Sequence, residues 1–430
     1  MSGGWRTLPL EDCMVAIIDY RGKTPEKTAF GVPLITAKVI KGGRIERTDE
    51  FIAEADFNAW MRRGMPKRGD IAMTTEAPLG QVAQLDGTKV ALAQRVITLR
   101  GKSEVLDNTF LKFLLQSQPV QEELQSRATG TTVLGIRQSE LRKVRLTLPP
   151  LAEQEAIAAV LGALDDKIEL NRRMNATLEA MARALFQSWF VDFDPVRAKL
   201  DGRPPTALDE GTAALFPEHF EHGEHEMLPL GWSHAAIERV CDINAWTLGK
   251  NDDLETLEYV EISEVSRGHI ANIASYTRGD EPSRARRRLR HGDTVLSTVR
   301  PDRGSYFLAL NPPENRVAST GFAVLTPTKV PWSFIHAALT QPEVSDHLGQ
   351  MADGGAYPAV RPEIIGAMQV ALPNEPKIFE ASHRTCAPLF EQAEANRIQS
   401  RTLATLRDTL LPKLLSGEVS VAEMEKEAVT

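Results

Sequence analysis

The sequence contains little cysteine and no long apolar run. Its three cysteines, Cys13, Cys241 and Cys386, lie far apart among 430 residues. That spacing fits neither a disulfide framework nor a zinc site and is typical of a reducing compartment. No stretch approaches the roughly 18 apolar residues that a membrane-spanning helix requires. The first residues, MSGGWRTLPLEDC, lack the basic and then apolar order of a signal peptide, so we expect a cytoplasmic protein.

The chain also lacks an excess of positive charge. It has 50 Lys and Arg against 58 Asp and Glu, a formal net charge of −8 at pH 7. A protein that binds nucleic acid by itself usually has a basic surface, because phosphate neutralisation dominates its affinity. The charge balance therefore argues against tight DNA binding by this chain alone, although its basic residues cluster locally. The length and the hydrophobic fraction of 42% favour a globular protein of two or three domains.

What the sequence does have is an internal repeat. Six matches keep the same order at offsets of 223–227 residues: Gly4-Trp5 with Gly231-Trp232, Gly43-x-Ile45 with Gly268-x-Ile270, Gly69-Asp70 with Gly292-Asp293, 128–137 (ATGTTVLGIR) with 352–361 (ADGGAYPAVR), Leu148-Pro149 with Leu372-Pro373, and 169–185 with 394–410. Such constancy indicates a duplication, in which each repeat is one structural unit.

Within each repeat the residue pattern changes at the Leu-Pro pair. Before it, short runs rich in Val, Ile and Thr alternate with Gly, Pro and Asp, which predicts a mixed sheet. The predicted strands are VPLITAKVI, GDIAMTT and KVALAQRVITLR in the first repeat and LEYVEISEV, GDTVLSTV and VASTGFAVLTP in the second. Short helices are predicted at FLKFLLQSQPVQEELQSR and WSFIHAALTQPEVSDHL.

After each Leu-Pro pair the pattern becomes that of a long helix. Mostly apolar residues at alternating steps of four and three run from Ile157 to Trp189 and from Leu389 to Leu414, with polar residues at the middle. Arg407 is the one discordant position of the second stripe. A sustained heptad stripe predicts a coiled coil. The connector is long enough for the second repeat to reverse, so that its helix can run antiparallel to the first and the two stripes can pair with pseudo-twofold symmetry.

These patterns predict an α+β fold with two tandem sheet domains, each followed by a long helix. The predicted segments are a sheet domain at 1–149, a long helix at 150–191, a connector at 192–227 with one short helix around 212–215, a second sheet domain at 228–373, a second long helix at 374–417 and a tail at 418–430.

Three segments resemble the specificity subunits of type I restriction–modification systems. They are 148–196, which begins LPPLAEQEAIA and continues through LDDKIELNRRMN, 402–419 (TLATLRDTLLPKLLSGEV) and 292–310 (GDTVLSTVRPDRGSYFLAL). The resemblance extends over essentially the whole chain, including the duplication, and is most specific in the central helix.

The resemblance implies a non-catalytic subunit that reads a bipartite, asymmetric DNA site. Each sheet domain would be a target-recognition domain for one half-site, and the paired helices would set the gap. Two methyltransferase subunits would dock on the chain, and up to two restriction and translocation subunits would join them. The complex would methylate adenine N6 with S-adenosylmethionine or cut DNA with ATP and Mg. Both cofactors would belong to the partners, and none to this chain.

The repeat makes Asn171 and Asn396 equivalent residues, each near the centre of its helix. If a pseudo-twofold axis relates the helices, the two side chains meet at that axis. We predict that they face one another and fix the register, as buried polar residues do in coiled coils. The alternative is that both point into solvent.

Basic residues and hydroxyls are the candidates for DNA contact. Arginine bonds both phosphates and guanine edges, so the densest basic run, 283–292 (SRARRRLRHG), predicts a groove-facing loop. The candidates are Lys38, Lys41, Arg44, Arg47, Arg62, Arg63, Lys67 and Arg68 in the first repeat, Arg284, Arg286, Arg287, Arg288, Arg290, Arg300 and Arg303 in the second, and the repeat-matched hydroxyls of Thr74, Thr75, Ser297 and Thr298. Charge runs are also typical of solvated faces, and the hydroxyls of ordinary strands. We expect Arg137 and Arg361 to tie each domain to its helix.

Two patterns suggest other chemistry only weakly. Asn311-Pro312-Pro313 is part of an amino-methyltransferase motif, but Glu314 replaces the aromatic that would stack on a flipped base. His219, His222 and His225 have zinc-like spacing in an acidic connector without cysteine. We therefore expect no catalytic, cofactor or metal site. A catalytic methyltransferase chain, a coiled-coil scaffold and a subunit of a methylation-only system stay open as alternatives.

Overall fold

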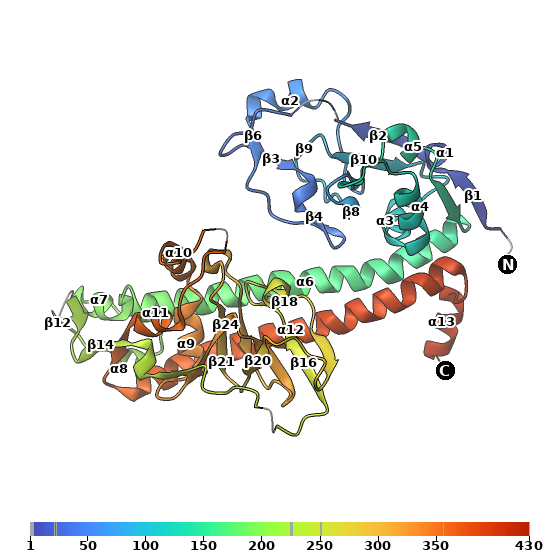
Figure 1. Cartoon of the computed structure of the whole chain (residues 1–430). Coiled ribbons are helices and arrows are strands. Elements are labelled where there is room, and N and C mark those ends of the chain that lie inside the picture. The colour runs from blue at the N-terminus through green and yellow to red at the C-terminus, as the bar shows by residue number, and fades with distance from the viewer. Residues whose placement is uncertain are drawn as a thin grey trace. The chain divides into compact units, whose positions relative to one another are not determined.

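The structure, a computed structural model, describes residues 4–20, 22, 24–223, 227–249, 252–355 and 357–429. They form two compact units. Unit 1 comprises the described residues of 1–169 and 400–430, and unit 2 those of 170–399. Each unit contains one sheet domain and one end of each long helix (Figure 1). Among the helices of these residues, none has the length and apolar character needed to cross a membrane.

The sheet domain of unit 1 is built on two main sheets. Its strands are β1 (Arg6–Pro9), β2 (Met14–Asp19), β3 (Val32–Ile35), β4 (Ile40–Lys41), β5 (Arg44–Ile45), β6 (Phe51–Ile52), β7 (Ile71–Thr75), β8 (Leu79–Gln84), β9 (Ala91–Leu92), β10 (Val96–Gly101) and β11 (Arg145–Leu148). The sheets have the orders β2-β10-β7-β8 and β6-β3-β9, with β4-β5 and β1-β11 as separate pairs. The helices are α1 (Leu10–Cys13), η1 (Ala37–Val39), η2 (Glu54–Asp56), α2 (Phe57–Trp60), α3 (Asn108–Gln116), α4 (Gln118–Ser126) and α5 (Gln138–Leu141).

The sheet domain of unit 2 has the same plan. Its strands are β14 (Trp232–Ala236), β15 (Cys241–Ile243), β16 (Thr256–Val260), β17 (Val265–Ser266), β18 (His269–Ile270), β19 (Ala274–Thr277), β20 (Ala285–Arg288), β21 (Asp293–Ser297), β22 (Tyr306–Ala309), β23 (Arg316–Ser319), β24 (Phe322–Pro327) and β25 (Gln369–Pro373). The sheets have the orders β15-β24-β21-β22 and β19-β16-β23-β20, with β17-β18 and β14-β25 as separate pairs. The helices are η3 (Ile237–Arg239), η4 (Ile262–Glu264), η5 (Pro301–Arg303), α9 (Trp332–Leu339), α10 (Pro342–Gln350) and α11 (Pro362–Ala367).

The sequence repeat is therefore also a repeat of topology. The sheet β2-β10-β7-β8 corresponds strand by strand to β15-β24-β21-β22, and the pair β1-β11 corresponds to β14-β25. The parallel pair β3-β9 corresponds to the parallel pair β16-β23. One strand differs: β20 adds an edge to its sheet, and in the part of unit 1 that the structure describes no strand takes that place. The predicted strands and short helices are confirmed in both repeats.

The two long helices are α6 (Leu151–Phe190) and α12 (Pro376–Ser416), as the heptad stripes predict. They pair antiparallel in unit 2, because Asn171 contacts Gln399 whereas Asn175, further along α6, contacts Ala393, which is earlier in α12. In unit 1, Asp165 contacts Arg407 at 2.6 Å, and in unit 2, Asn175 Nδ2 donates to the Ala393 carbonyl at 2.9 Å. Arg407, the discordant position of the stripe, is thus matched by a carboxylate on the facing helix.

The ends of the long helices complete the cores of both domains. In unit 1, Ile157 and Leu161 of α6 and Leu414 of α12 lie in one apolar cluster with Phe110 of α3. The predicted tail forms a helix, α13 (Val421–Val429), which the sequence pattern did not indicate. Val421 of this helix lies in the same cluster, so the core of unit 1 includes residues outside the sheet domain.

The connector is more structured than the single short helix expected for it. It contains α7 (Asp194–Leu200), α8 (Glu210–Leu215) and a hairpin of β12 (Phe220–His222) and β13 (Met227–Pro229). Aromatic contacts explain this order. The ring of Phe216 meets the edge of Trp189 at a centroid distance of 5.3 Å and also packs on Trp232. The acidic composition of the segment concealed these apolar anchors.

Candidate nucleic-acid interface

Each sheet domain has a tight corner that the duplication has preserved. In unit 1 the corner follows β7, where Ala77 has φ +51° before Pro78. In unit 2 it follows β21, where Arg300 has φ +47° before Pro301. A positive φ is unfavourable for alanine and arginine, so the surrounding structure must hold both residues there. The two corners are therefore a shared structural feature.

A hairpin, residues 128–137, packs against the corner of unit 1. The Ile136 N–H donates to the Thr75 carbonyl at 3.0 Å, which fixes the base of the hairpin to the end of β7. At the tip, Val133 is 53% exposed and Leu134 is 45% exposed. We call residues 128–137 the first hairpin.

The equivalent hairpin in unit 2, residues 352–361, follows α10 (Figure 1). The Val360 N–H donates to the Thr298 carbonyl at 2.9 Å, the same bond as in unit 1. Its tip carries Tyr357, which is 75% exposed. The Arg300 guanidinium lies 5.2 Å from the centre of the Tyr357 ring, within cation–π range. We call the described residues 352–355 and 357–361 the second hairpin.

The four repeat-matched hydroxyls belong to these corners and are buried. Thr74, Thr75, Ser297 and Thr298 are only 0%, 3%, 3% and 8% exposed. The hydroxyls of Thr75, Ser297 and Thr298 donate to backbone carbonyls at 3.3, 2.7 and 2.8 Å, and Thr74 Oγ1 accepts a backbone N–H at 2.9 Å. Phosphate contact by these four residues stays a prediction, and their burial and backbone hydrogen bonds favour the alternative that they are ordinary strand residues.

The basic candidates of unit 1 are exposed. This set is Lys38, Lys41, Arg44, Arg47, Arg62, Arg63, Lys67 and Arg68. Three of them have carboxylates nearby: Lys38 lies 3.9 Å from Asp49, and Lys41 and Arg44 lie 3.3 and 3.9 Å from Glu46. Exposed pairs of this kind are weak and can exchange partners. Contact of these residues with DNA stays a prediction.

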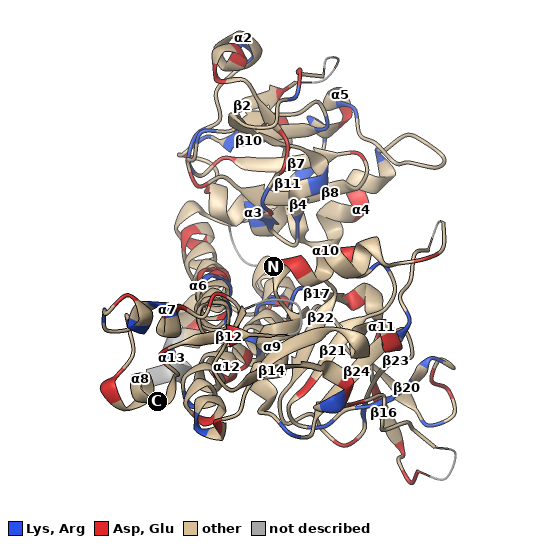
Figure 2. Ribbon diagram, turned by 90° about the vertical axis from the view of Figure 1, so that its left-hand side faces the viewer, with Lys and Arg blue, Asp and Glu red and all other residues tan. Residues whose placement is uncertain are grey.

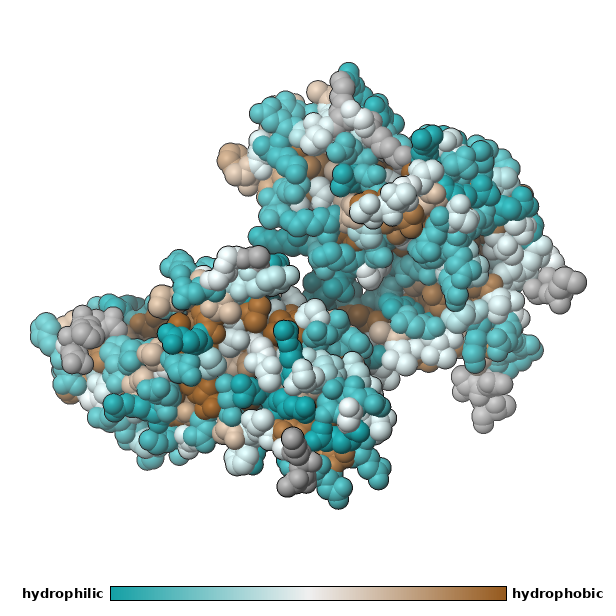
Figure 3. Space-filling view, in the orientation of Figure 1, coloured by the Kyte–Doolittle hydropathy of each residue, from teal (hydrophilic) through white to brown (hydrophobic). Residues whose placement is uncertain are grey.

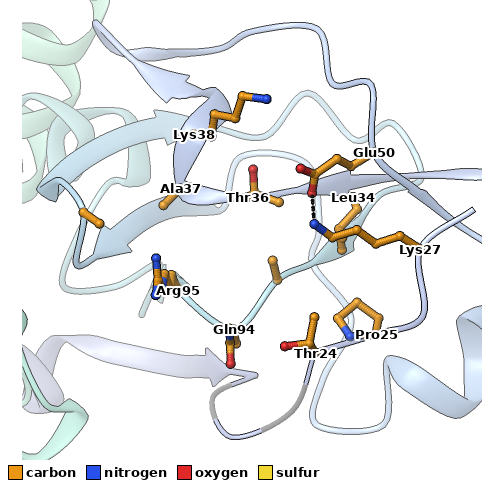
Figure 4. Close-up of a pocket in the computed structure, with 12 residues that line it drawn as sticks. Thr24, Pro25, Lys27, Leu34, Thr36, Ala37, Lys38, Glu50, Gln94 and Arg95 are labelled. Carbon is orange, nitrogen blue, oxygen red and sulfur yellow. Dashed lines mark ion pairs between the residues drawn. The ribbon is translucent and has the colours of Figure 1, made fainter. Parts of the chain in front are cut away.

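A pocket of about 340 Å³ opens in unit 1 beside its corner (Figure 4). Five segments line it: residues 24–27, the end of β3 with η1, Glu50, Ala77 of the corner, and residues 93–95 before β10. Lys27 Nζ lies 2.8 Å from Glu50 Oε2, and Arg95 Nε lies 2.6 Å from Glu76 Oε1. The lining also includes Lys38, so three cations surround the pocket. Lysine, arginine, hydroxyl and amide groups of this kind bind phosphates and base edges.

The basic run of unit 2 divides by environment (Figure 2). Arg284 is exposed at the start of β20, whereas Arg286 lies 3.1 Å from the buried Glu281 carboxylate. Arg288 lies 3.6 Å from Asp252 and 3.2 Å from Glu314. These carboxylates already compensate Arg286 and Arg288, which the sequence run could not indicate. Of these three arginines, Arg284 is therefore the strongest candidate for a phosphate.

The other arginines of the run have different surroundings. Arg287 is half-buried, its Nε has no hydrogen-bond partner among the described residues, and burial lowers the pKa of its guanidinium. The Arg290 guanidinium lies 3.1 Å from the centre of the Trp246 ring. Arg303 is exposed in η5. DNA contact by these arginines stays a prediction.

Arg137 and Arg361 do not tie the domains to the long helices. Both are exposed and precede the short helices α5 and α11, where their carbonyls accept the first backbone bonds. No hydrogen bond or ion pair joins either guanidinium to α6 or α12 in the described part of the chain. The expectation is wrong because each arginine caps a short helix that lies between the hairpin and the last strand.

The centre of the helix pair contains a buried asparagine cluster. Asn171 Nδ2 donates to the Asn396 carbonyl at 3.3 Å and to Gln399 Oε1 at 2.8 Å. Asn396 Nδ2 in turn donates to Asn175 Oδ1 at 2.9 Å. Asn171 and Asn396 are 0% and 5% exposed, so the two repeat equivalents meet in the interior, and not in solvent. Their role in fixing the register stays a prediction.

The two weak chemical leads lie on ordinary surface segments. Asn311 adopts φ +46° in the turn between β22 and β23. His219 and His222 are exposed at the β12 hairpin, and His225 lies outside the described residues. Among the residues that the structure describes, no group of three His, Cys, Asp or Glu side chains is arranged to hold a metal ion.

Sequence reasoning missed several residues of the two corners. Lys27, Gln94 and Arg95 reach one pocket from segments far apart in sequence, so no local pattern marks them. Tyr357 and Trp246 are exposed aromatics beside arginines. The repeat alignment did place Tyr357 opposite Val133, and both are apolar. That correspondence was the available signal for the hairpin tips.

Comparison with known proteins places these features in a family context. A family model described as type I restriction modification DNA specificity domain matches residues 23–180. The type I restriction enzyme HindI specificity subunit of Haemophilus influenzae is 24% identical over 408 residues, which cover 82% of this chain and 87% of that protein. The MjaIX specificity subunit of Methanocaldococcus jannaschii is 24% identical over 422 residues, covering 94% and 91%.

The solved structures show the same fold. A type I restriction-modification system S subunit from M. genitalium is 18% identical, with a TM-score of 0.55 over 96% of this chain and 97% of that chain. The predicted fold class, two sheet domains each followed by a long helix, is therefore confirmed.

Proposed function

Since this chain belongs to the type I restriction–modification specificity subunits, we propose that its two sheet domains read the two halves of a bipartite, asymmetric DNA site. The chain provides DNA sequence specificity. The observation that carries the proposal is the duplication with divergence: the two domains share strand order and corners, but β20 and its arginines belong to one of them. A shared frame with different surface side chains suits two readers of different half-sites.

The long helices would set the gap between the half-sites. Helices of 40 and 41 residues are each about 60 Å long at roughly 1.5 Å per residue. One base pair more or less moves a half-site by about 3.4 Å and turns it by about 35°. A flexible linker imposes no such distance, whereas a paired helix with buried polar residues does.

The chemistry would belong to partner subunits. A specificity subunit acts with methyltransferase and restriction subunits. We propose two of the former and up to two of the latter, with S-adenosylmethionine, ATP and Mg bound by them and none by this chain. The chain itself would be non-catalytic. Such a complex acts on the DNA of its own cell, so the proposal also includes a cytoplasmic location.

Mapping of N6-methyladenine across the genome tests the proposal. Cells with the chain and its methyltransferase partner should show one bipartite motif with a fixed gap, and cells without the chain should lose it. Replacement of 228–373 by the equivalent domain of a relative should change one half of the motif and leave the other. The proposal would be contradicted if the motif persisted in cells without the chain, or if the domain replacement changed both halves of the motif.

Three alternatives have separate readouts. A catalytic methyltransferase chain would transfer methyl groups to DNA when purified alone with S-adenosylmethionine, and we expect no transfer. A subunit of a methylation-only system would give the same motif without restriction of unmodified phage DNA. A pure scaffold would leave both methylation and DNA binding of its partners unchanged.

A further inference from the structure

The two hairpins differ in side chains but agree in geometry. Thr129 pairs with Gly135 in the first hairpin, and Asp353 pairs with Ala359 in the second. Both are attached through the same backbone bond to the strand before the corner. A feature kept in both repeats serves something common to the two half-sites, whereas base reading requires the repeats to differ.

The tips are apolar and exposed in both units. Val133, Leu134 and Tyr357 are 53%, 45% and 75% exposed, on a surface that is mainly hydrophilic in the view of Figure 3. Val and Leu side chains have no hydrogen-bonding group, and Tyr has a single hydroxyl. They therefore cannot distinguish the donor and acceptor patterns of base edges, but they can add contact area and stacking.

Charge near the tips favours an anionic partner. In unit 2, Arg300 lies against the Tyr357 ring and Arg361 is exposed at the end of the hairpin, with Asp353 as the acidic residue at its base. In unit 1, Arg137 is exposed at the equivalent position, and Glu76 beside the hairpin is paired with Arg95 at 2.6 Å. Apolar tips flanked by arginines match a DNA groove better than an apolar protein surface.

We propose that the two hairpins are a sequence-independent DNA contact. Val133 and Leu134 of the first hairpin and Tyr357 of the second pack against sugars and bases of a groove, while other residues of each domain read the half-site. This inference rests on the proposed function and adds to it a second class of contact, which fixes how each domain sits on DNA whatever its target.

The test uses the assembled complex of this chain with its methyltransferase partner. The variants are Val133→Ser with Leu134→Ser, and Tyr357→Ser. Matched controls are Val15→Ser and Leu230→Ser, which replace residues 62% and 52% exposed elsewhere on units 1 and 2. Affinity is measured over one fixed series of salt concentrations on a duplex with the mapped motif and on a duplex that lacks both halves.

We expect each hairpin variant to bind both duplexes roughly 10-fold more weakly, since it loses the stacking and apolar contacts of the tip. The ratio of the two affinities and the salt dependence should not change, and Tyr357→Phe should restore binding. The controls should bind like the unaltered complex. Unchanged affinity would overturn the inference, as would a loss confined to the motif duplex, which indicates base reading.

A third outcome also overturns it. If the variants fail to co-purify with the methyltransferase subunit, the hairpins bind a protein and not DNA. Failure of the proposed function is distinct, because the unaltered chain would then direct no bipartite motif at all.

Discussion

In unit 1, the buried Asp70 at the start of β7 accepts hydrogen bonds from Arg100 Nε and Nη2, each at 2.7 Å. Its repeat equivalent, the buried Asp293 at the start of β21, accepts one from the Thr326 hydroxyl at 2.7 Å. Both also accept a backbone N–H from three residues before. The same turn is thus kept in both domains, while the compensation of its charge has changed from an ion pair to a hydroxyl.

In unit 2, a hydroxyl and not a guanidinium bonds the buried Asp293 carboxylate, and its pKa is shifted as a result. Burial raises the pKa of Asp293 from 3.8 to about 6, and the bonds from Thr326 and Arg290 only partly oppose this. In unit 1 the bond to Asp70 raises the pKa of Arg100. The comparison teaches that the duplication constrains backbone geometry at the turn more tightly than it constrains electrostatics. The two domains also differ at the surface, because strand β20 of unit 2 has no counterpart among the described strands of unit 1.

Replacement of Arg100 should give the largest loss of stability, because it removes the ion pair that distinguishes the turn of unit 1 from that of unit 2. Arg100→Ala leaves the Asp70 charge buried with the Lys67 backbone N–H as its donor, which costs about 3–5 kcal/mol of stability. Hydrogen exchange of the β7 and β10 amides and the melting temperature would report it. Arg95→Ala, which removes a more exposed pair with Glu76, is the control and should cost less than about 1 kcal/mol. Equal costs for both variants would contradict the argument.

Replacement of Asp293 by a neutral residue should change the pH dependence of the unfolding free energy. Because its pKa is raised to about 6, ionisation disfavours the folded state, so its stability contribution is full below about pH 4 and is lost as pH rises to about 6. The shift corresponds to about 3 kcal/mol. Asp293→Asn should remove this slope, measured as the difference in unfolding free energy between variant and unaltered chain.

That difference matters because another group titrates in the opposite direction. Burial lowers the pKa of His336 to about 3, and its contribution is lost as pH falls. It is common to both chains and cancels. An identical pH profile for the two chains would show that Asp293 is not the source of the slope.

The asparagine cluster is the place where equivalent residues of the two repeats meet. Asn171→Leu with Asn396→Leu should change stability by no more than about 2 kcal/mol, since buried asparagine specifies register at some cost. The predicted loss is of specificity: methylated motifs should appear with more than one gap length. Met174→Leu, on the exposed face of α6, is the control. A single unchanged gap and unchanged stability would refute the register role.

The smallest expected effect is a difference in the salt dependence of DNA binding between variants of Arg284 and Arg286. Arg284→Ala should weaken DNA binding and reduce the salt slope by about one, as loss of one phosphate contact does. Arg286→Ala should leave the slope unchanged, because Glu281 already holds that guanidinium. The salt dependence of binding by the assembled complex gives both values. Equal slopes for the two variants would mean that the ion pair with Glu281 opens on DNA.

The sequence predicted the large elements and missed the side-chain partners. Heptad spacing indicated α6 and α12, and the repeat brought Asn171 opposite Asn396. Both depend on periodicity, which is a local property of the chain. Asn175, the third member of the cluster, lay in the same stripe, but only the packed pair shows that it receives the Asn396 amide.

The candidate site was harder to predict because exposure is decided by tertiary structure. Thr74 and Ser297 align in the repeat and appear suited to phosphate, but they align because both support a corner. Arg286 and Arg288 differ from Arg284 only through carboxylates at Glu281, Asp252 and Glu314. Residues such as Arg95 reach the pocket from another part of the chain and leave no local signal.

The composition of unit 1 has a consequence for biosynthesis. Its core needs Leu414 and Val421, which are separated from the rest of the unit by residues 170–399. At roughly 5–20 residues per second, the ribosome takes about 10–50 s to make that intervening segment. The apolar surface of unit 1 around Ile157 and Leu161, although made first, therefore stays uncovered until Leu414 and Val421 have been synthesised. A chain that stopped before these residues would present an N-terminal domain with exposed apolar surface to chaperones and proteases.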